Sequence, residues 1–100
     1  MAKKITPSTG NVFEDLGFPK EEAENLRVRS ALMATIRTIL EEEGLTQAQA
    51  AKLFGVTQPR VSDLVRGKVE LFSIDALVNM VAASGRHVHI SIGTPKDEAA

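Results

Sequence analysis

Side chains whose hydrogen-bonding groups match those of nucleic acids are concentrated between positions 57 and 68. The amide of Gln58 can bond bidentately to adenine, and the guanidinium of Arg60 can bond to guanine O6 and N7 or to a phosphate. Ser62 can hydrogen-bond to a base or a phosphate, whereas Arg66 and Lys68 suit the sugar–phosphate backbone. Any one of these side chains could simply be solvated, but the whole set on one face indicates a nucleic-acid ligand.

The surrounding segment, residues 46–68, has the pattern of a helix-turn-helix, two helices joined by a short turn that contains glycine. Thr46 is a good N-cap for the first helix, and Gly55 can adopt the left-handed conformation that ends it. Ala51 stands where the two helices must cross closely, so a small side chain is required there. The apolar positions recur at helical spacing, at Ala50, Ala51 and Phe54 in the first helix and at Val61, Leu64 and Val65 in the second.

The second helix is predicted to begin at Thr57, as its N-cap, or close to it. Pro59 sets this register, because proline is tolerated only in the first turn of a helix, where its missing N–H would have no partner anyway. Val56 fills the corner between the helices, and Gly67 closes the second one. An ordinary helical hairpin is the alternative, but it does not require all of these caps, stops and apolar positions together.

This segment resembles the helix-turn-helix of the lambda-repressor and Cro-like (XRE) family. The stretch Gln-Pro-Arg-Val-Ser-Asp-Leu-Val-Arg-Gly-Lys at 58–68, followed by residues 72–92, is similar to a small subfamily of HigA-like regulators. Many of these are antitoxins encoded beside RelE/HigB-like ribonuclease toxins. The resemblance covers about residues 11–92 and implies a DNA-binding repressor, with such a toxin as a possible partner.

The resemblance also places the N-terminal end of the second helix against base edges. Gln47, near the start of the first helix, matches a phosphate contact of the family, assisted by the helix N-terminus. Asp63 would repel a phosphate, so it either accepts from cytosine N4 or holds Arg60 or Arg66; we favour the second. The predicted DNA-binding residues are Gln47, Thr57, Gln58, Pro59, Arg60, Ser62, Asp63, Arg66 and Lys68.

The net charge of −1 is unusual for a DNA-binding protein, but the charges are unevenly distributed. Segment 45–68 has four basic residues against Asp63 alone, a local charge of +3, and phosphate attraction needs only a basic face. Segment 11–24 has five acidic residues against Lys20, a local charge of −4. This acidic end either is solvated surface, which we favour, or meets a basic partner.

The composition excludes several other classes of function. With 100 residues, 43% of them hydrophobic, one compact domain is expected. The chain has no cysteine, which excludes disulfides, thiol chemistry and the usual zinc-finger ligands. No Ser-His-Asp order, phosphate loop or paired-carboxylate motif is present, so we expect neither an enzyme nor a cofactor. The N-terminus does not resemble a signal peptide and no apolar run approaches membrane-spanning length, so we expect a cytoplasmic protein without membrane contact.

Helical patterns account for most of the remaining chain. Residues 1–10 are expected to be a flexible tail, and Val12, Phe13, Leu16 and Phe18 are available to pack in a short arm. After Pro19 a helix of about 24 residues is predicted. Its three C-terminal acids oppose the helix dipole, so its last turn should be either weak or supported by neighbours, and Ser30 marks a possible kink. Residues 69–72 are predicted to form a loop whose Leu71 and Phe72 side chains are buried (the Leu-Phe plug), and a helix is predicted from Ser73 to about Ser84. The predicted inner faces are Leu26, Met33, Ile36, Ile39 and Leu40 in the long helix and Leu77, Val78 and Val81 in the last.

Residues 87–92 alternate strictly and predict one C-terminal β-strand. A lone strand leaves its backbone unpaired, so we expect two copies to pair antiparallel across a twofold axis, although packing on its own subunit is the alternative. His87 and His89 could in principle hold a metal between two subunits, but partly exposed strand histidines are the simpler interpretation, and no metal is expected. The predicted dimer contacts are Val88, His89, Ile90 and Ile92, and residues 93–100 are expected to be a second flexible tail.

The predicted fold is therefore mainly α, a lambda-repressor-like helical bundle over residues 11–92 with a helix-turn-helix and one C-terminal strand. The predicted function is a homodimeric, sequence-specific repressor of a palindromic operator, acting as an antitoxin that represses its own toxin–antitoxin operon. A free-standing XRE-type regulator is one alternative. An adaptor that has lost DNA binding is another, but an adaptor has no reason to keep the polar, basic face of residues 58–68.

Overall fold

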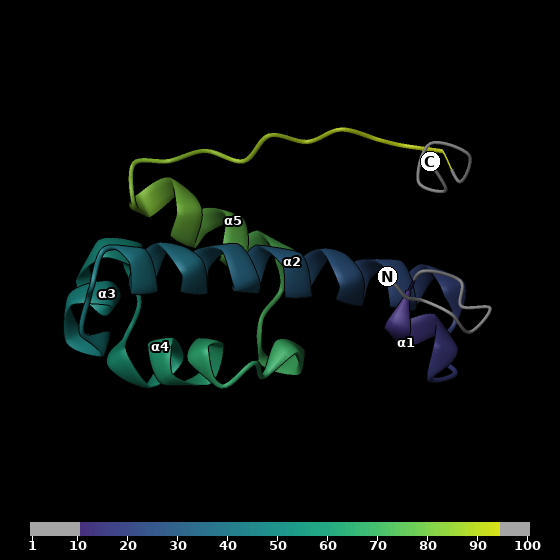
Figure 1. Ribbon diagram of the computed structural model, residues 1–100, viewed down its shortest axis with the longest axis horizontal. Helices are drawn as coiled ribbons and strands as arrows, with labels where there is room; N and C mark the ends of the chain where they lie inside the picture. The colour runs from purple at the N-terminus through teal and green to yellow at the C-terminus, as the bar shows by residue number, and fades with distance from the viewer. Residues whose placement is uncertain (1–10, 95–100) are drawn as a thin grey trace.

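The computed structural model describes residues 11–94 as five α-helices and one 3₁₀ turn. The elements are α1 (Val12–Asp15), α2 (Lys20–Glu42), α3 (Gln47–Phe54), α4 (Gln58–Val65), η1 (Val69–Leu71) and α5 (Ile74–Ala83). Figure 1 shows α2 running the length of the molecule, with α1 at one end, α3 at the other, and α4 and α5 on either side. The mainly α prediction is confirmed, while the predicted tail 1–10 and most of the tail 93–100 lie outside the described residues.

Helix α2 is the frame against which the other helices pack. It is continuous from Lys20 to Glu42, so the kink considered near Ser30 is absent; one serine costs a helix only a few tenths of a kcal/mol. Of its three C-terminal acids, Glu43 is supported by a neighbour, because Arg86 donates from Nη2 to its carboxylate. The inner face is as predicted except that Ile39 is only half-buried; the buried residues are Ala23, Leu26, Met33, Ile36 and Leu40.

The core lies between α2, α3, α4 and α5, and two aromatic rings anchor it. Phe54 ends α3 and is 2% exposed, and Phe72 follows η1 and is 1% exposed. Full burial of one such ring contributes about 1.5–3 kcal/mol to folding. The predicted Leu-Phe plug is therefore half right, because Leu71 remains 44% exposed. Leu77 and Val81 are buried as predicted, with Met80 in addition, and Val78 is half-buried.

The predicted C-terminal strand is wrong for the chain by itself. Residues 86–94 run alongside α2 and α5 in an extended path (Figure 1), but no segment within 11–94 forms a strand. A strand exists only through hydrogen bonds to a neighbouring strand, and residues 11–94 supply no such neighbour. Val88 packs against the core, while Ile90 and Ile92 are 79% and 91% exposed.

The arm at the other end of α2 also packs less than its pattern predicts. Helix α1 buries none of its residues, and Val12 and Leu16 are 61% and 70% exposed. Phe13 is half-buried and meets the ring of Phe18 edge-on, with centroids 6.2 Å apart. Nowhere in residues 11–94 is there a helix long and apolar enough to cross a membrane.

Candidate nucleic-acid interface

Helix α3 is capped at both ends by the residues that the sequence indicates. The Thr46 hydroxyl accepts from the backbone N–H of Gln49 at 3.1 Å, and the Gln49 side chain accepts from the Thr46 N–H at 2.9 Å. This reciprocal capping box satisfies two N–H groups that the helix itself cannot. At the other end Gly55 has φ +70°, and the N–H of Val56 returns to the carbonyl of Ala51 at 3.0 Å. Helix α3 is thus a fixed support for the turn that follows.

Helix α4 begins at Gln58, immediately after Thr57, which confirms the register set by Pro59. Thr57 has the extended backbone of an N-cap, but its side chain makes no capping hydrogen bond, contrary to the prediction. Gly67, with φ +75°, closes the helix as predicted. The N–H of Lys68 bonds to the carbonyl of Asp63 at 3.1 Å and the N–H of Gly67 to that of Leu64 at 3.0 Å, which together form a Schellman motif.

The packing of α4 determines which of its side chains remain available. Val61 and Leu64 are each 2% exposed and face the core, where they meet the small residues of α3, Ala50 and Ala51. At 3.6 residues per turn, the stripe opposite them contains Pro59, Ser62, Asp63 and Arg66, with Gln58 at its edge. Of the predicted site residues, Thr57, Gln58, Pro59 and Arg66 are exposed, whereas Gln47, Arg60, Ser62, Asp63 and Lys68 are half-buried.

Arg60 lies on the flank of α4, between the buried and the outward stripes. Its guanidinium carbon is 4.1 Å from the centroid of the Phe72 ring, and its Nη1 donates to the carbonyl of Leu71 at 2.9 Å. One face of the guanidinium and one N–H group are therefore engaged within the protein, which the sequence did not predict. The remaining N–H groups are still available to a ligand, since arginine has five.

Asp63 pairs with Lys68 and not with either of the two arginines that the sequence suggested. Its Oδ1 lies 3.8 Å from Nζ of Lys68, and the predicted hold on Arg60 or Arg66 is wrong. The reason is the Schellman turn, because Gly67 folds the chain back and brings Lys68 over the last turn of α4. Both partners are partly exposed, so the pair contributes little to stability.

Comparison with known proteins agrees with this geometry. A family model described as a helix-turn-helix domain matches residues 12–93. The chain belongs to this helix-turn-helix family. A relative from Haemophilus influenzae, described as an uncharacterized HTH-type transcriptional regulator, is 30% identical over 89 residues, which is 87% of this chain and 90% of the relative. The prediction of a helix-turn-helix, DNA-binding transcriptional regulator is confirmed at this level.

Two arginines of α2 extend the basic character of the regulator beyond the predicted residues. Arg37 donates from Nη1 to the carbonyl of Val65 at 3.3 Å, at the C-terminal end of α4. Arg29 donates to the carbonyls of Val69 and Phe72 at 3.4 and 3.3 Å, which ties η1 to α2. Cations at a helix C-terminus compensate its partial negative charge. These two arginines were not predicted from the sequence. Their eight-residue spacing, which places them near one face of α2, is the pattern that could have identified them.

The two histidines belong to the extended segment that follows α5, which Figure 1 shows on the other side of α2 from α4. The rings of His87 and His89 meet edge-on with centroids 4.7 Å apart. Among residues 11–94 there is no group of three or more His, Cys, Asp or Glu side chains that could hold a metal ion.

Proposed function

We propose that this regulator is a sequence-specific repressor that binds a palindromic operator as a homodimer and acts as an antitoxin controlling its own operon. The observation that carries the DNA-reading part is the outward stripe of α4. Its polar residues stand on a helix whose register and both ends are determined by local chemistry and whose opposite side is buried in the core. A helix held in this way can enter the major groove with its side chains already oriented.

The side chains proposed to contact DNA, on the stripe and beside it, differ in the part of DNA that they can contact. Gln58, exposed at the start of α4, has the amide that pairs bidentately with adenine. Arg60 is fixed against Phe72, so its free N–H groups can meet guanine without a further loss of side-chain entropy. Arg66 and Lys68, at the other end of α4, are placed for phosphates. Gln47 at the start of α3, together with Thr57, Pro59, Ser62 and Asp63, completes the proposed contact set.

The homodimer is proposed to form through residues 87–92. Their extended backbone has no strand partner within residues 11–94, and Ile90 and Ile92 are largely exposed. Antiparallel pairing with a second copy would satisfy this backbone and cover Val88, His89, Ile90 and Ile92. The twofold axis would also hold two α4 helices about one helical turn of DNA apart, as a palindromic site requires.

The chain has no cysteine, which allows a clean test of the dimer. Pairing across a twofold axis brings residues near the centre close to their own copies, so Ile90→Cys is expected to form a disulfide-linked dimer on mild oxidation. Glu42→Cys, an exposed position at the end of α2, is the matched control and is expected to stay monomeric under denaturing conditions. Cross-linking from Glu42→Cys alone would contradict the proposed interface.

Sequence-specific binding by the proposed repressor is tested with the DNA upstream of its own gene. We expect a footprint of two half-sites about one helical turn apart. Gln58→Ala is expected to lose affinity for this DNA but not for a scrambled duplex, while Asn79→Ala on the exposed side of α5 should bind as the wild type. Equal affinity of the wild type for both duplexes would overturn the proposal.

The antitoxin role rests on the resemblance to HigA-like regulators. It is supported if the adjacent reading frame encodes a small basic RelE/HigB-like ribonuclease whose toxicity is relieved by co-expression of this chain. An adjacent gene of any other kind would leave a free-standing XRE-type regulator.

A further inference from the structure

The end of the molecule farthest from α3 exposes a group of apolar side chains. We define the N-terminal arm as residues 11–19, which contain α1 and the turn that leads into α2. Within this short segment Val12 is 61% exposed, Leu16 70% and Phe18 38%. Single exposed apolar residues are common on protein surfaces, but neighbouring ones that form a patch mark a site of interaction.

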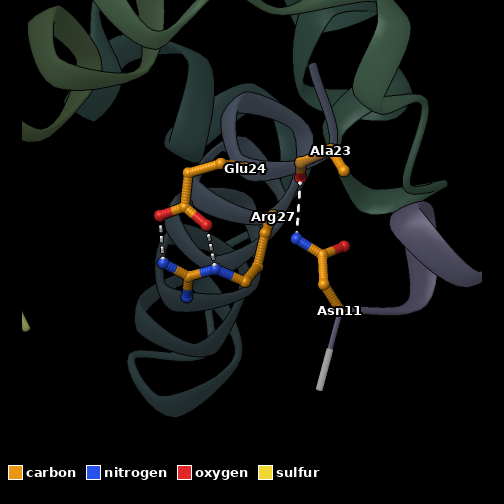
Figure 2. Close-up of polar contacts among 4 residues, drawn as sticks. All are labelled: Asn11, Ala23, Glu24 and Arg27. Atoms are coloured by element: carbon orange, nitrogen blue, oxygen red, sulfur yellow. Dashed lines mark hydrogen bonds and ion pairs between the residues drawn. The ribbon is translucent and has the colours of Figure 1, made fainter. Parts of the chain in front are cut away.

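The arm is held in place by polar contacts and not by burial of these side chains. The Oδ1 of Asn11 accepts from the backbone N–H groups of Phe13 and Glu14 at 2.9 and 3.2 Å, which caps α1. The Nδ2 of the same residue donates to the carbonyl of Ala23 in α2 at 3.1 Å (Figure 2). A helix of four residues has no stability of its own in water, so these contacts and the half-buried Phe13 are what attach it. The result is an ordered helix that keeps its apolar residues outward.

Acidic side chains are frequent in the arm and in the first turns of α2, which follow it directly. Segment 11–24 has a local charge of −4, and Glu14, Glu21 and Glu22 make no ion pair with any residue in the range 11–94. Glu24 differs from them, because Arg27 donates to both of its carboxylate oxygens at 2.9 and 2.6 Å (Figure 2). These carboxylates therefore give the rim of the patch a negative potential that no ion pair within residues 11–94 compensates.

This combination of charge and apolar surface selects the kind of partner. DNA is excluded as the occupant, because carboxylates repel phosphates. A second copy of the arm is also disfavoured, since a symmetric contact would bring two acidic rims together. A protein with a basic surface would pair with the rim, and apolar pockets on it would take Leu16 and Val12 as anchors.

We propose that the N-terminal arm and the first turn of α2 form a docking surface for a basic protein, with Val12 and Leu16 as the apolar anchors and Glu14, Glu21 and Glu22 as the charged rim. The arm and α3 lie at opposite ends of α2 (Figure 1), so the docked protein leaves α4 open to DNA. The partner and an operator duplex can therefore bind at the same time. The proposal does not depend on the antitoxin assignment, because any basic protein with suitable pockets would satisfy it.

The test begins by photo-cross-linking in the native host. Val12 and Leu16 are replaced, one at a time in the full chain, by p-benzoylphenylalanine, with Glu42 at the other end of α2 as the control position. We expect both arm positions, and not the control, to form an adduct with a protein of net positive charge, identified by mass spectrometry. An adduct only with a second copy of this chain, an adduct only with an acidic protein, or no adduct at all would overturn the proposal.

The identified protein is then purified and its binding measured by calorimetry. Leu16→Asp is expected to weaken binding by about tenfold or more, as for a central anchor of an interface. Leu71→Asp, the same change at an exposed leucine outside the arm, is expected to leave this binding unchanged. The double change Glu21→Lys and Glu22→Lys should weaken binding most at low salt. Circular dichroism establishes that each variant is folded, and a folded Leu16→Asp variant that binds like the wild type would overturn the proposal.

Discussion

Replacing Arg60 by alanine removes a contact between the proposed DNA-reading helix and the segment that follows it. In the free protein the guanidinium stacks on Phe72 at 4.1 Å and donates to the carbonyl of Leu71 at 2.9 Å. The change therefore releases the flank of α4 from η1 even when no DNA is present. A residue that only contacted DNA would have no such effect on the free protein.

The expected loss of stability follows from these two contacts. A cation–π pair at a partly exposed site contributes about 0.5–1 kcal/mol. The hydrogen bond is solvent-accessible and contributes about 0.5–1.5 kcal/mol, because water can replace the lost donor at the exposed Leu71. The sum is about 1–2.5 kcal/mol, and each kcal/mol lowers the Tm of a domain of this size by about 4–8 °C.

Thermal unfolding followed by circular dichroism measures this loss, with Gln58→Ala as the matched control. Gln58 is exposed, so its replacement should change stability by less than about 0.5 kcal/mol. In anisotropy titrations Arg60→Ala should also cost about 1–3 kcal/mol of specific binding, with relaxed preference at one base pair. An unchanged Tm for Arg60→Ala would refute the structural part of this reasoning, and an equal loss on all DNA sequences would reduce Arg60 to a phosphate contact.

The other predictions concern single positions with separate readouts. Lys68→Ala should weaken binding to all DNA sequences alike and reduce the slope of log affinity against log salt by about one, in anisotropy titrations across salt concentrations. Ile90→Pro removes a backbone donor and should dissociate the dimer in sedimentation; an unchanged dimer would place the interface elsewhere, for example on α2. In Gly67→Ala the alanine would have to keep φ +75°, although its Cβ would meet no neighbouring atom. The free energy of unfolding measured in urea should therefore fall by about 1–2 kcal/mol. The hydrogen bonds and charge of Arg27 hold the pKa of Glu24 below its ordinary value. The wild type should therefore be more stable than Glu24→Gln above the pKa of Glu24 in the unfolded chain, and should lose this advantage as the pH falls through the lower pKa of Glu24 in the folded protein. Thermal melts at several pH values measure the difference.

The helix boundaries around the proposed site were predictable because they depend on neighbouring residues in the chain. Thr46, Gly55, Pro59 and Gly67 each act through the backbone within a few positions, and each lies where the local rules place it. The residues that bind Arg60 could not be found in this way. Phe72 meets the Arg60 guanidinium because of the path that the chain takes after α4, which is a property of the tertiary structure.

Two apolar patterns could be recognised in the sequence, but it could not be predicted what covers their side chains in the folded protein. Alternation at 88–92 indicates an extended chain with one apolar side, but hydrogen bonds from a second strand decide whether it becomes a sheet. In the arm, the same apolar residues that suggested packing are mostly exposed at Val12 and Leu16. A sequence pattern reports that a surface is apolar and does not report whether the chain itself or a partner covers it.

The unequal capping of α3 and α4 has a consequence for local unfolding. Helix α3 is closed by a capping box and by a left-handed glycine, whereas α4 starts without a side-chain cap and with a proline that has no N–H to offer. Amide hydrogens in the first turn of α4 should therefore exchange with solvent faster than those of α3, through fraying that leaves Val61 and Leu64 in the core. Such fraying would let the first turn adjust to a groove while the rest of the domain stays fixed. The ordering of that turn on DNA would then appear as slower exchange confined to the amides of Gln58, Arg60 and Val61.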